Sequence, residues 1–363
     1  MRLSKEQLEK IKEENNTDRI WSWSRMNTYL TSPYEYKLKY IDNMAEDRVD
    51  CIYGSMGGLC HDVLDKYYEQ EIPYEKMILE FEDGYGIYRD VFNLKFDRNT
   101  PDKDENLAKR YHDNLYHFYL HHIPYTNNLI IEDPVTIKIG DNVFVGYIDA
   151  MYQDGEDWYI LDFKSSSIYT GATLTEHSGQ LVLYAIGVSQ TKEVPLDKIH
   201  IGFNFLKYAT IEYEMANGSI KKMNVERRLL GEKLQSSCKM WLKKFGYEPE
   251  EYLKDILDNP DNFNKLPLEV QDKIKIKDCH VFIDLTPELV DYWENLIIDT
   301  LNEIEVKETE FYITNDETIF YDTPEQVEKE SYYMATLCGF SANLHKPYKK
   351  YLDNLEKPID IFS

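Results

Sequence analysis

Two aspartates and a lysine lie on neighbouring segments that both have the pattern of a β-strand. Asp149 lies in VFVGYIDAMY, and Asp162 and Lys164 lie in WYILDFKSSS. An Asp-Gly-Glu turn signal separates the two segments, which predicts an antiparallel hairpin. If the turn is centred between Gly155 and Glu156, paired residue numbers sum to 311, and this register places Asp149 directly opposite Asp162.

This arrangement predicts a site for a divalent cation. Directly opposed side chains have Cβ atoms about 5 Å apart, and two carboxylates at that distance repel unless a proton or a cation lies between them. Oxygen ligands of this kind suit Mg²⁺ or Mn²⁺, which can activate water and stabilise charge on a phosphate. Lys164 points to the same face as Asp162, where its ammonium would orient the water and stabilise developing negative charge.

Two other interpretations of the same three residues stay open on hairpin geometry alone. The group could be a solvated cross-strand charge cluster in which Lys164 only offsets the two aspartates. It could also be the carboxylate pair of a glycosidase, whose separation is similar. The lysine is not required by glycoside hydrolysis, which favours the metal site over that alternative.

The elements that must position this hairpin follow from hydrophobic periodicity and turn residues. Strands are predicted over 128–139, 143–152, 158–167, 200–215 and 279–285. Helices are predicted over 4–16, over 21–41 with an interruption near Ser32-Pro33, over 59–70 after a glycine-rich start at 54–58, over 104–122, over 175–189 and over 287–304. The chain is also expected to be mostly helical after about 225. No linker separates these segments, so the pattern indicates a mixed α/β fold with helical additions. The polar, tyrosine-rich stretch 310–363 is left without an assignment.

Composition limits the class of protein. The chain has 363 residues, 30 Tyr and 15 Phe, enough for a large buried core. No segment has the composition of a signal peptide or a membrane span, and five scattered cysteines favour reduced thiols. These features predict a cytoplasmic protein. The net charge of −25 has the wrong sign for a protein that coats nucleic acid.

One segment, 221–244, is rich in basic residues. It contains Lys221, Lys222, Arg227, Arg228, Lys233, Lys239, Lys243 and Lys244, against only two glutamates. The segment could be an ordinary solvated helix face, or it could contact DNA phosphates. The predicted DNA contacts are Arg227, Arg228, Lys239, Lys243 and Lys244.

Four ordered motifs resemble one nuclease superfamily. The pattern G-Y-I-D (146–149), twelve residues, then D-F-K (162–164) resembles the core signature of the PD-(D/E)XK nucleases. GSMGGLCHDVLDKYY resembles the helix that carries a metal-binding histidine in the branch containing the RecB and AddB nuclease domains and the CRISPR-associated adaptation exonucleases. QLVLY resembles the Q-x-x-x-Y helix of that branch, and WSWSRMNTYLTSPYEYKLKYI resembles its N-terminal helices.

The resemblance implies a restriction-endonuclease-like α/β fold, in which a mixed sheet is flanked by helices and extended by C-terminal helices. It implies an N-terminal helix over 1–20 and one nuclease domain over 21–363, with a core at about 21–215 and a helical elaboration at about 216–363. The implied metal ligands are His61, Asp149, Asp162 and the backbone carbonyl of Phe163. Lys164 would act on the attacking water, with Gln180 near that water or a DNA phosphate and Tyr184 supporting the lysine or the substrate.

The implied function is that of an Mg²⁺- or Mn²⁺-dependent DNA exonuclease in recombination, repair or replication. DNA would be the substrate, and recombination or replication proteins are candidate partners in a bacterial or phage-infected cell. The alternatives are a PD-(D/E)XK endonuclease and a non-catalytic DNA-binding or scaffold protein that retains the fold. An intact D…D-x-K with His61 argues against the non-catalytic alternative.

Two further patterns bear on metals. Many members of the resembled branch bind an iron–sulfur cluster through four cysteines, but here the first position is Ser32 and the C-terminal region offers Cys338, with Ser341 and His345 beyond it. We therefore expect no iron–sulfur cluster. His117 and His121, with adjacent His122, have the spacing of a metal clip, although an exposed helix face is the more common meaning of that spacing.

Overall fold

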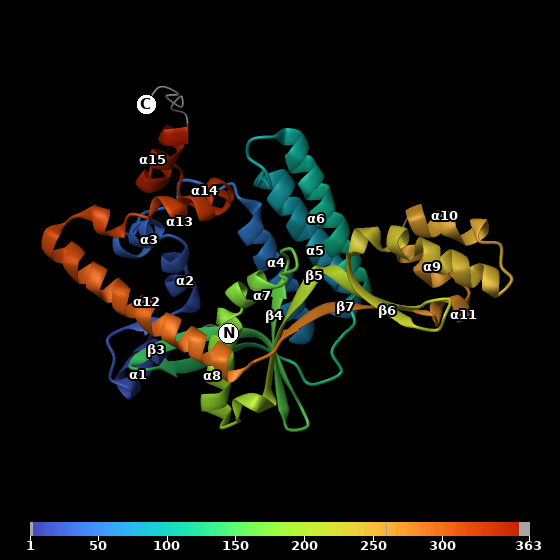
Figure 1. Cartoon of the computed structure of the whole chain (residues 1–363), viewed down its shortest axis with the longest axis horizontal. Helices are drawn as coiled ribbons and strands as arrows, with labels where there is room; N and C mark the ends of the chain where they lie inside the picture. Colours follow the sequence, from blue (N-terminus) through green and yellow to red (C-terminus); the bar gives the residue numbers. More distant parts are fainter. Residues whose placement is uncertain (1–2, 259, 356–363) are drawn as a thin grey trace.

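A mixed β-sheet forms the centre of the molecule in the computed structural model, which describes residues 3–258 and 260–355 (Figure 1). Within the described part the sheet has seven strands. They are β1 (Ile20–Trp21), β2 (Ile130–Ile139), β3 (Asn142–Asp154), β4 (Asp157–Lys164), β5 (Ile199–Glu214), β6 (Ile220–Glu226) and β7 (Ile274–Ile283). The predicted mixed α/β sheet with flanking helices is confirmed.

The strand order places β3 and β4 at the centre. β3 pairs antiparallel with β2 and β4 and parallel with β1, while β4 pairs parallel with β5. β6 and β7 both pair antiparallel with β5. The parallel step from β4 to β5 needs a crossover, which the helices between Ala172 and Lys192 provide.

Helices precede and follow the β3–β4 hairpin along the chain. Before the hairpin they are α1 (Lys5–Asn15), α2 (Trp23–Thr31), α3 (Pro33–Tyr36), a π-helical turn (Lys37–Ile41), α4 (Ile52–Tyr68), α5 (Met77–Gly86) and α6 (Pro101–His121). After it they are α7 (Ala172–His177), α8 (Gly179–Lys192), α9 (Leu230–Lys244), α10 (Glu250–Asp258), α11 (Leu268–Gln271), α12 (Pro287–Thr314), α13 (Pro324–Lys329), α14 (Ser331–Thr336) and α15 (Lys346–Leu355). The described part contains no helix of the length and apolarity that a membrane crossing requires.

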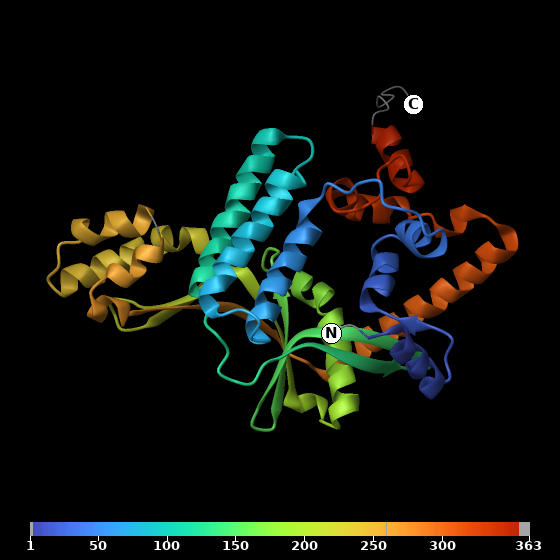
Figure 2. The same ribbon diagram turned by 180° about the vertical axis from the view of Figure 1, so that it is seen from behind.

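Separate hydrophobic cores hold these helices to the sheet. Along β4, Ile160 packs in a core with α2, α8 and α12, whereas Leu161 and Phe163 pack in a second core with α4, α5 and α6. Alternate side chains of a strand point to opposite faces, so the two helix groups cover opposite faces of the central sheet. A third core joins α9–α11 to the ends of β5–β7 and forms the lobe at one end of the molecule (Figure 2).

The chain differs from the sequence-based prediction in its second half. Residues 220–226 form strand β6 rather than the start of a helix, because their alternating pattern pairs with the far end of β5. The region predicted to be a helical elaboration, about 216–363, therefore contributes both β6 and β7 to the sheet. Helix α12 continues to Thr314, ten residues beyond its predicted end.

A buried hydrogen-bonded group joins the N-terminal helices to the C-terminal ones. Ser32 donates to Asp322 (3.1 Å) and lies 3.0 Å from Nε2 of His345. The backbone N–H of Tyr348 donates to Nδ1 of His345, so Nε2 carries the proton and donates to Ser32. Two positions discussed above for iron–sulfur ligation, Ser32 and His345, thus contact each other across 313 residues of sequence.

Candidate metal centre

The β3–β4 hairpin has the predicted register. Ala150 pairs with Leu161 and Asp154 pairs with Asp157, and the residue numbers of each pair in this ladder sum to 311. The ladder ends at Ala150, and beyond it the carboxylate of Asp149 accepts a hydrogen bond from the backbone N–H of Phe163 at 3.0 Å. The end of the hairpin therefore holds the Asp149 carboxylate against β4, close to the segment that carries the second aspartate.

Asp162 and Lys164 form an ion pair at the same end. Nζ of Lys164 lies 2.6 Å from Oδ2 of Asp162, whose side chain is 4% exposed. The two opposite charges are therefore in direct contact. Burial lowers the pKa of Lys164, but the charges of Asp162 and Asp149 outweigh burial and raise it above its ordinary value. Lys164 is consequently a cation at neutral pH.

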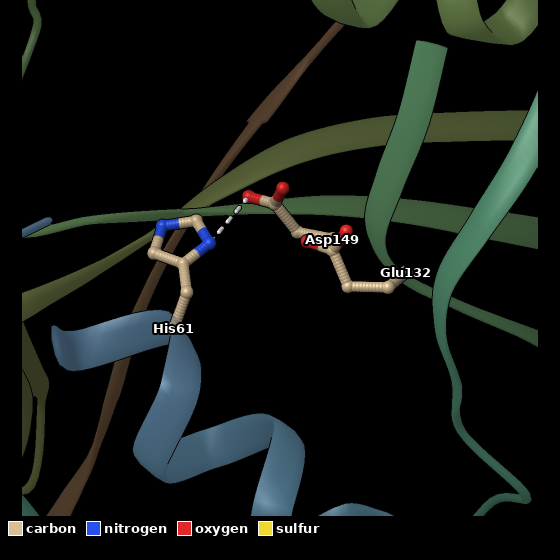
Figure 3. A group of neighbouring side chains, drawn as sticks. All are labelled: His61, Glu132 and Asp149. Carbon is tan, nitrogen blue, oxygen red and sulfur yellow. Dashed lines mark ion pairs between the residues drawn. The ribbon is translucent and has the colours of Figure 1, made fainter. Parts of the chain in front are cut away.

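His61 reaches this group from α4, as predicted. Its Nε2 lies 3.0 Å from the carbonyl oxygen of Phe163, which can only accept, so Nε2 carries the proton. In the neutral ring Nδ1 then presents a lone pair, 3.6 Å from Oδ2 of Asp149 (Figure 3). Two lone pairs that face each other need a proton or a cation between them. The Phe163 carbonyl was predicted to be a metal ligand. In the structure it accepts the hydrogen bond of His61 Nε2 and so orients the ring, and its second lone pair remains for another contact.

Glu132 is a member of the group that sequence reasoning missed. Ligand atoms of His61, Glu132 and Asp149 all lie within 4.8 Å of one another. Glu132 lies on β2 between Ile131, which pairs with Ala150, and Asp133, which pairs with Ile148. The only local peculiarity is its backbone, which has φ 48° and so lies in the left-handed region. Nothing in the sequence marks that conformation.

Crowded negative charge shifts the protonation of the carboxylates. Burial, followed by the charge of Asp162, raises the pKa of Asp149 to about 7. Burial, followed by the charge of Glu132, raises the pKa of Asp65, one helical turn after His61, to about 7 as well. Carboxylates whose pKa is raised in this way, together with an imidazole nitrogen, are a donor set that fits Mg²⁺ or Mn²⁺.

We expect the affinity for Mn²⁺ to depend on pH. A cation must displace the proton that the raised pKa of Asp149 retains, so affinity is full above about pH 7 and is lost as the pH falls. One displaced proton corresponds to about tenfold weaker binding at about pH 6 than at about pH 8. Calorimetric titrations in buffers of different ionisation enthalpy count that proton. Binding of equal strength at both pH values, without proton release, would contradict the expectation.

Gln180 and Tyr184 extend the group from α8. Nε2 of Gln180 donates to the Tyr184 hydroxyl at 3.0 Å, as expected for residues one helical turn apart. The ring of Tyr184 lies over Gly146, where a Cβ atom would come within 2.4 Å of Cε1. Burial raises the pKa of Tyr184 to about 12, and the charges of Asp149 and Asp162 add to the effect. The glycine of G-Y-I-D is therefore explained by the approach of this tyrosine to β3.

The predicted DNA contacts are placed differently. Arg227 is 1% exposed and pairs with Asp278 at 2.5 Å, so the expectation of an accessible cation there is wrong. Arg228 is exposed and pairs with Glu226. Lys239, Lys243 and Lys244 lie on α9, which both views place in the end lobe, beyond α6 from α4 (Figures 1 and 2).

The histidines at the end of α6 belong to a structural network. His122 is buried, with Nδ1 2.6 Å from Asp278 and Nε2 2.6 Å from the hydroxyl of Tyr68. His117 is buried too, 3.4 Å from Arg227, while His121 is exposed. Neither a metal clip nor a wholly exposed helix face describes them. Among the described residues, the group of possible metal ligands consists of His61, Glu132 and Asp149.

The family model described as the PD-(D/E)XK nuclease superfamily matches residues 20–310. That range includes the whole hairpin, α4, α8 and all seven strands. No individual curated protein matches the chain.

Proposed function

The chain belongs to the PD-(D/E)XK nuclease superfamily, and from this premise we propose that it is an Mg²⁺- or Mn²⁺-dependent deoxyribonuclease. The observation that carries the proposal is the convergence of Asp149, Asp162, Lys164 and His61 at one end of the β3–β4 hairpin. The restriction-endonuclease-like α/β architecture supplies that hairpin. A buried cluster of this kind is also poorly described as a solvated charge patch, because the Asp162 side chain is 4% exposed.

We assign the cation to Asp149 and Asp162, with His61 beside them. A divalent ion bound there would lower the pKa of a coordinated water and neutralise charge on the scissile phosphate. Phe163 contributes through its backbone, since its N–H holds the Asp149 carboxylate and its carbonyl holds the His61 ring. Such supporting hydrogen bonds keep ligands in one orientation and maintain affinity.

Lys164 has a role set by its charge. Because its pKa is raised, it cannot remove a proton from water at neutral pH. Its ammonium would instead donate hydrogen bonds to the attacking water or a phosphate oxygen and stabilise negative charge in the transition state. Gln180 and Tyr184 would position that water or the substrate from α8, through the hydrogen bond that joins them.

We further propose that the enzyme is an exonuclease that acts in the cytoplasm during recombination, repair or replication. The physical support is charge, because a chain at −25 should bind the sides of a duplex poorly and so depend on a confined site. Arg228, Lys239, Lys243 and Lys244 remain proposed outer contacts to DNA. If these residues contact DNA phosphates, replacing Lys243 and Lys244 by Ala should make DNA affinity less dependent on salt concentration. An unchanged salt dependence would show that these two lysines do not contact DNA.

Digestion of end-labelled linear DNA and covalently closed circular DNA, with and without Mn²⁺, tests the activity. We expect metal-dependent degradation of the linear DNA and little cutting of the circle. Rapid cutting of the circle would identify an endonuclease. DNA binding without any cleavage in Mg²⁺ or Mn²⁺ would support the rival candidate, a non-catalytic DNA-binding or scaffold protein.

A further inference from the structure

We propose that the cavity between helix α1 and strands β1 and β3 binds an unpaired nucleotide of a single nucleic-acid strand. The inference deepens the proposed function and rests on it, because the bound strand would be the one that the metal centre cuts. Helix α1 ends before residue 20, where the match to the superfamily begins. One wall of the cavity therefore lies outside the part of the chain that the family model matches.

The cavity is a built space between α1 and the sheet. Its volume is about 740 Å³, within the range of about 300–1,000 Å³ that is typical of ligand sites. The residues that line it include Leu8 of α1, Trp21 of β1, and Val145 and Tyr147 of β3. The backbone N–H of Leu3 donates to the Tyr147 hydroxyl at 2.8 Å, which ties the start of α1 to β3. Both views accordingly place α1 beside β3 (Figures 1 and 2).

The cavity lies along β3 from the metal centre. Tyr147 precedes Asp149 by two residues, which is about 7 Å along a strand. The ring of Tyr184 from α8 lies over Gly146, and successive side chains of a strand point to opposite faces. Tyr147 therefore points away from α8, toward the face covered by α4, the helix that brings His61 to Asp149. A strand held in the cavity would reach the metal centre along this face of β3.

The charge of the cavity is opposite to that of the whole chain, which carries −25. Four cations line it against two carboxylates; the cations are Lys5, Lys12, Arg19 and Arg25, and the carboxylates are Glu9 and Asp18. Lys12 pairs with Glu9 at 2.8 Å, whereas Lys5 makes no ion pair with any of the described residues. An acidic chain that gathers cations around one cavity attracts anions to that cavity.

Aromatic rings and arginines share one wall of the cavity. The guanidinium carbon of Arg19 lies 4.2 Å from the centroid of the Trp21 ring, and that of Arg25 lies 5.1 Å from both Trp21 and Tyr40. Glu308 is the carboxylate that the two arginines share, at 2.7 Å from Arg19 and 3.9 Å from Arg25. The side chain of Arg25 is 24% exposed. It is thus a guanidinium group held against rings, incompletely neutralised and accessible to a ligand.

This combination of groups defines the class of ligand. Lysines and arginines contact the phosphates of a nucleic acid, while aromatic rings and guanidinium planes stack on its bases. In a duplex the bases are stacked on each other, so only an unpaired nucleotide presents its base to a cavity. A free nucleotide has the same chemistry, but it lacks the backbone that would connect the cavity with the metal centre.

Binding of a fluorescein-labelled oligothymidylate of about twelve nucleotides to the full chain in EDTA tests the proposal without cleavage. Lys5→Ala combined with Lys12→Ala should weaken binding about tenfold and lower the salt slope by about 1.4, because each phosphate contact to a single strand contributes about 0.7. Lys10→Ala is the matched control. Lys10 lies on the same helix outside the cavity lining, is 72% exposed and pairs with Glu14, as Lys12 pairs with Glu9. This variant should bind as the unmodified chain does.

Cross-linking locates the bound strand. An oligonucleotide that contains 5-iododeoxyuridine, irradiated in EDTA, should cross-link to Tyr40 or Tyr147, and the cross-link should weaken in the Lys5→Ala, Lys12→Ala variant. No cross-link to either tyrosine would overturn the proposal. Thymidine 5′-monophosphate that binds as tightly as the oligonucleotide would also overturn it, because the cavity would then be a site for free nucleotides. Melting curves of all variants should coincide, since the substituted lysines are on the surface of α1.

The outcomes separate this inference from the proposed function. Equal oligonucleotide affinity of the double variant and Lys10→Ala, with Mn²⁺-dependent degradation of linear DNA by both, would overturn the cavity site and leave the nuclease standing. Binding that depends on Lys5 and Lys12, without cleavage in Mg²⁺ or Mn²⁺, would uphold the cavity site and overturn the nuclease.

Discussion

Cleavage of linear DNA is expected to fall about 10²–10³-fold in Lys164→Ala and at least as far in Asp162→Asn. Lys164 lies directly beside a predicted metal ligand, with Nζ 2.6 Å from Asp162. Its removal withdraws a charge that stabilises the transition state and leaves the buried Asp162 carboxylate without its partner. Asp162→Asn weakens the metal site itself, so Mn²⁺ affinity should fall with activity.

Matched controls distinguish the loss of a proposed catalytic side chain from the loss of a charged side chain elsewhere on the surface. Lys198→Ala removes a lysine that is 41% exposed and pairs with the hairpin turn, and Asp157→Asn removes an aspartate at the other end of β4. Both should cleave at the unmodified rate. Melting curves with and without Mn²⁺ establish that each variant is folded. Unmodified rates in both Lys164→Ala and Asp162→Asn would remove these residues from the active site.

The second large effect concerns stability rather than cleavage. Arg227→Met is expected to destabilise the protein by about 3–5 kcal/mol, because it leaves a buried carboxylate without its cation. Asp278 is buried and contacts Arg227 at 2.5 Å, Nδ1 of His122 at 2.6 Å and the N–H of Ile123 at 3.1 Å. These contacts tie the end of α6 to β7 and to the turn that precedes α9.

The pKa of Asp278 fixes the sign of the pH dependence. Burial favours its protonated form, but the hydrogen bond with His122 and the charge of Arg227 outweigh burial and hold its pKa at about 2. A lowered folded-state pKa stabilises the protein above the unfolded value of about 3.9, and that contribution is lost as the pH falls through about 2. At neutral pH the full contribution is present, so urea unfolding at neutral pH measures the whole loss.

Two comparison variants sharpen this test. Arg228→Met changes the adjacent arginine, which is 35% exposed and pairs with Glu226, and should cost less than about 1 kcal/mol. Arg227→Met combined with Asp278→Leu removes both charges and should recover part of the loss. If Arg227→Met unfolds at the same urea concentration as the unmodified chain, the buried ion pair of Arg227 and Asp278 does not stabilise the fold.

Much of the candidate metal centre could be predicted from residues that lie close together in the sequence. The Asp-Gly-Glu turn fixes the register of a hairpin whose strands are adjacent in sequence, so the pairing of Ala150 with Leu161 follows from the turn alone. Helical periodicity places His61 on α4, and the four-residue spacing of Gln180 and Tyr184 places them on one face of α8. Each of these relations spans a few residues, within which backbone geometry leaves little choice.

Other features depend on contacts between distant segments, which periodicity does not encode. Glu132 joins the metal centre because β2 pairs with β3 in a register that brings it opposite Asp149. Arg227 is buried because β7, some fifty residues later in the chain, brings Asp278 to it. The pattern of charges in the sequence, taken alone, predicts that this arginine lies on a solvated helix face. Ser32 meets His345 because the C-terminal helices pack on the N-terminal ones. The sequence alone determined which residues could do the proposed chemistry and how the hairpin presents them. Tertiary packing decided which charges are buried and which third carboxylate lies beside the two hairpin aspartates, because burial and cross-strand partners are properties of the assembled sheet.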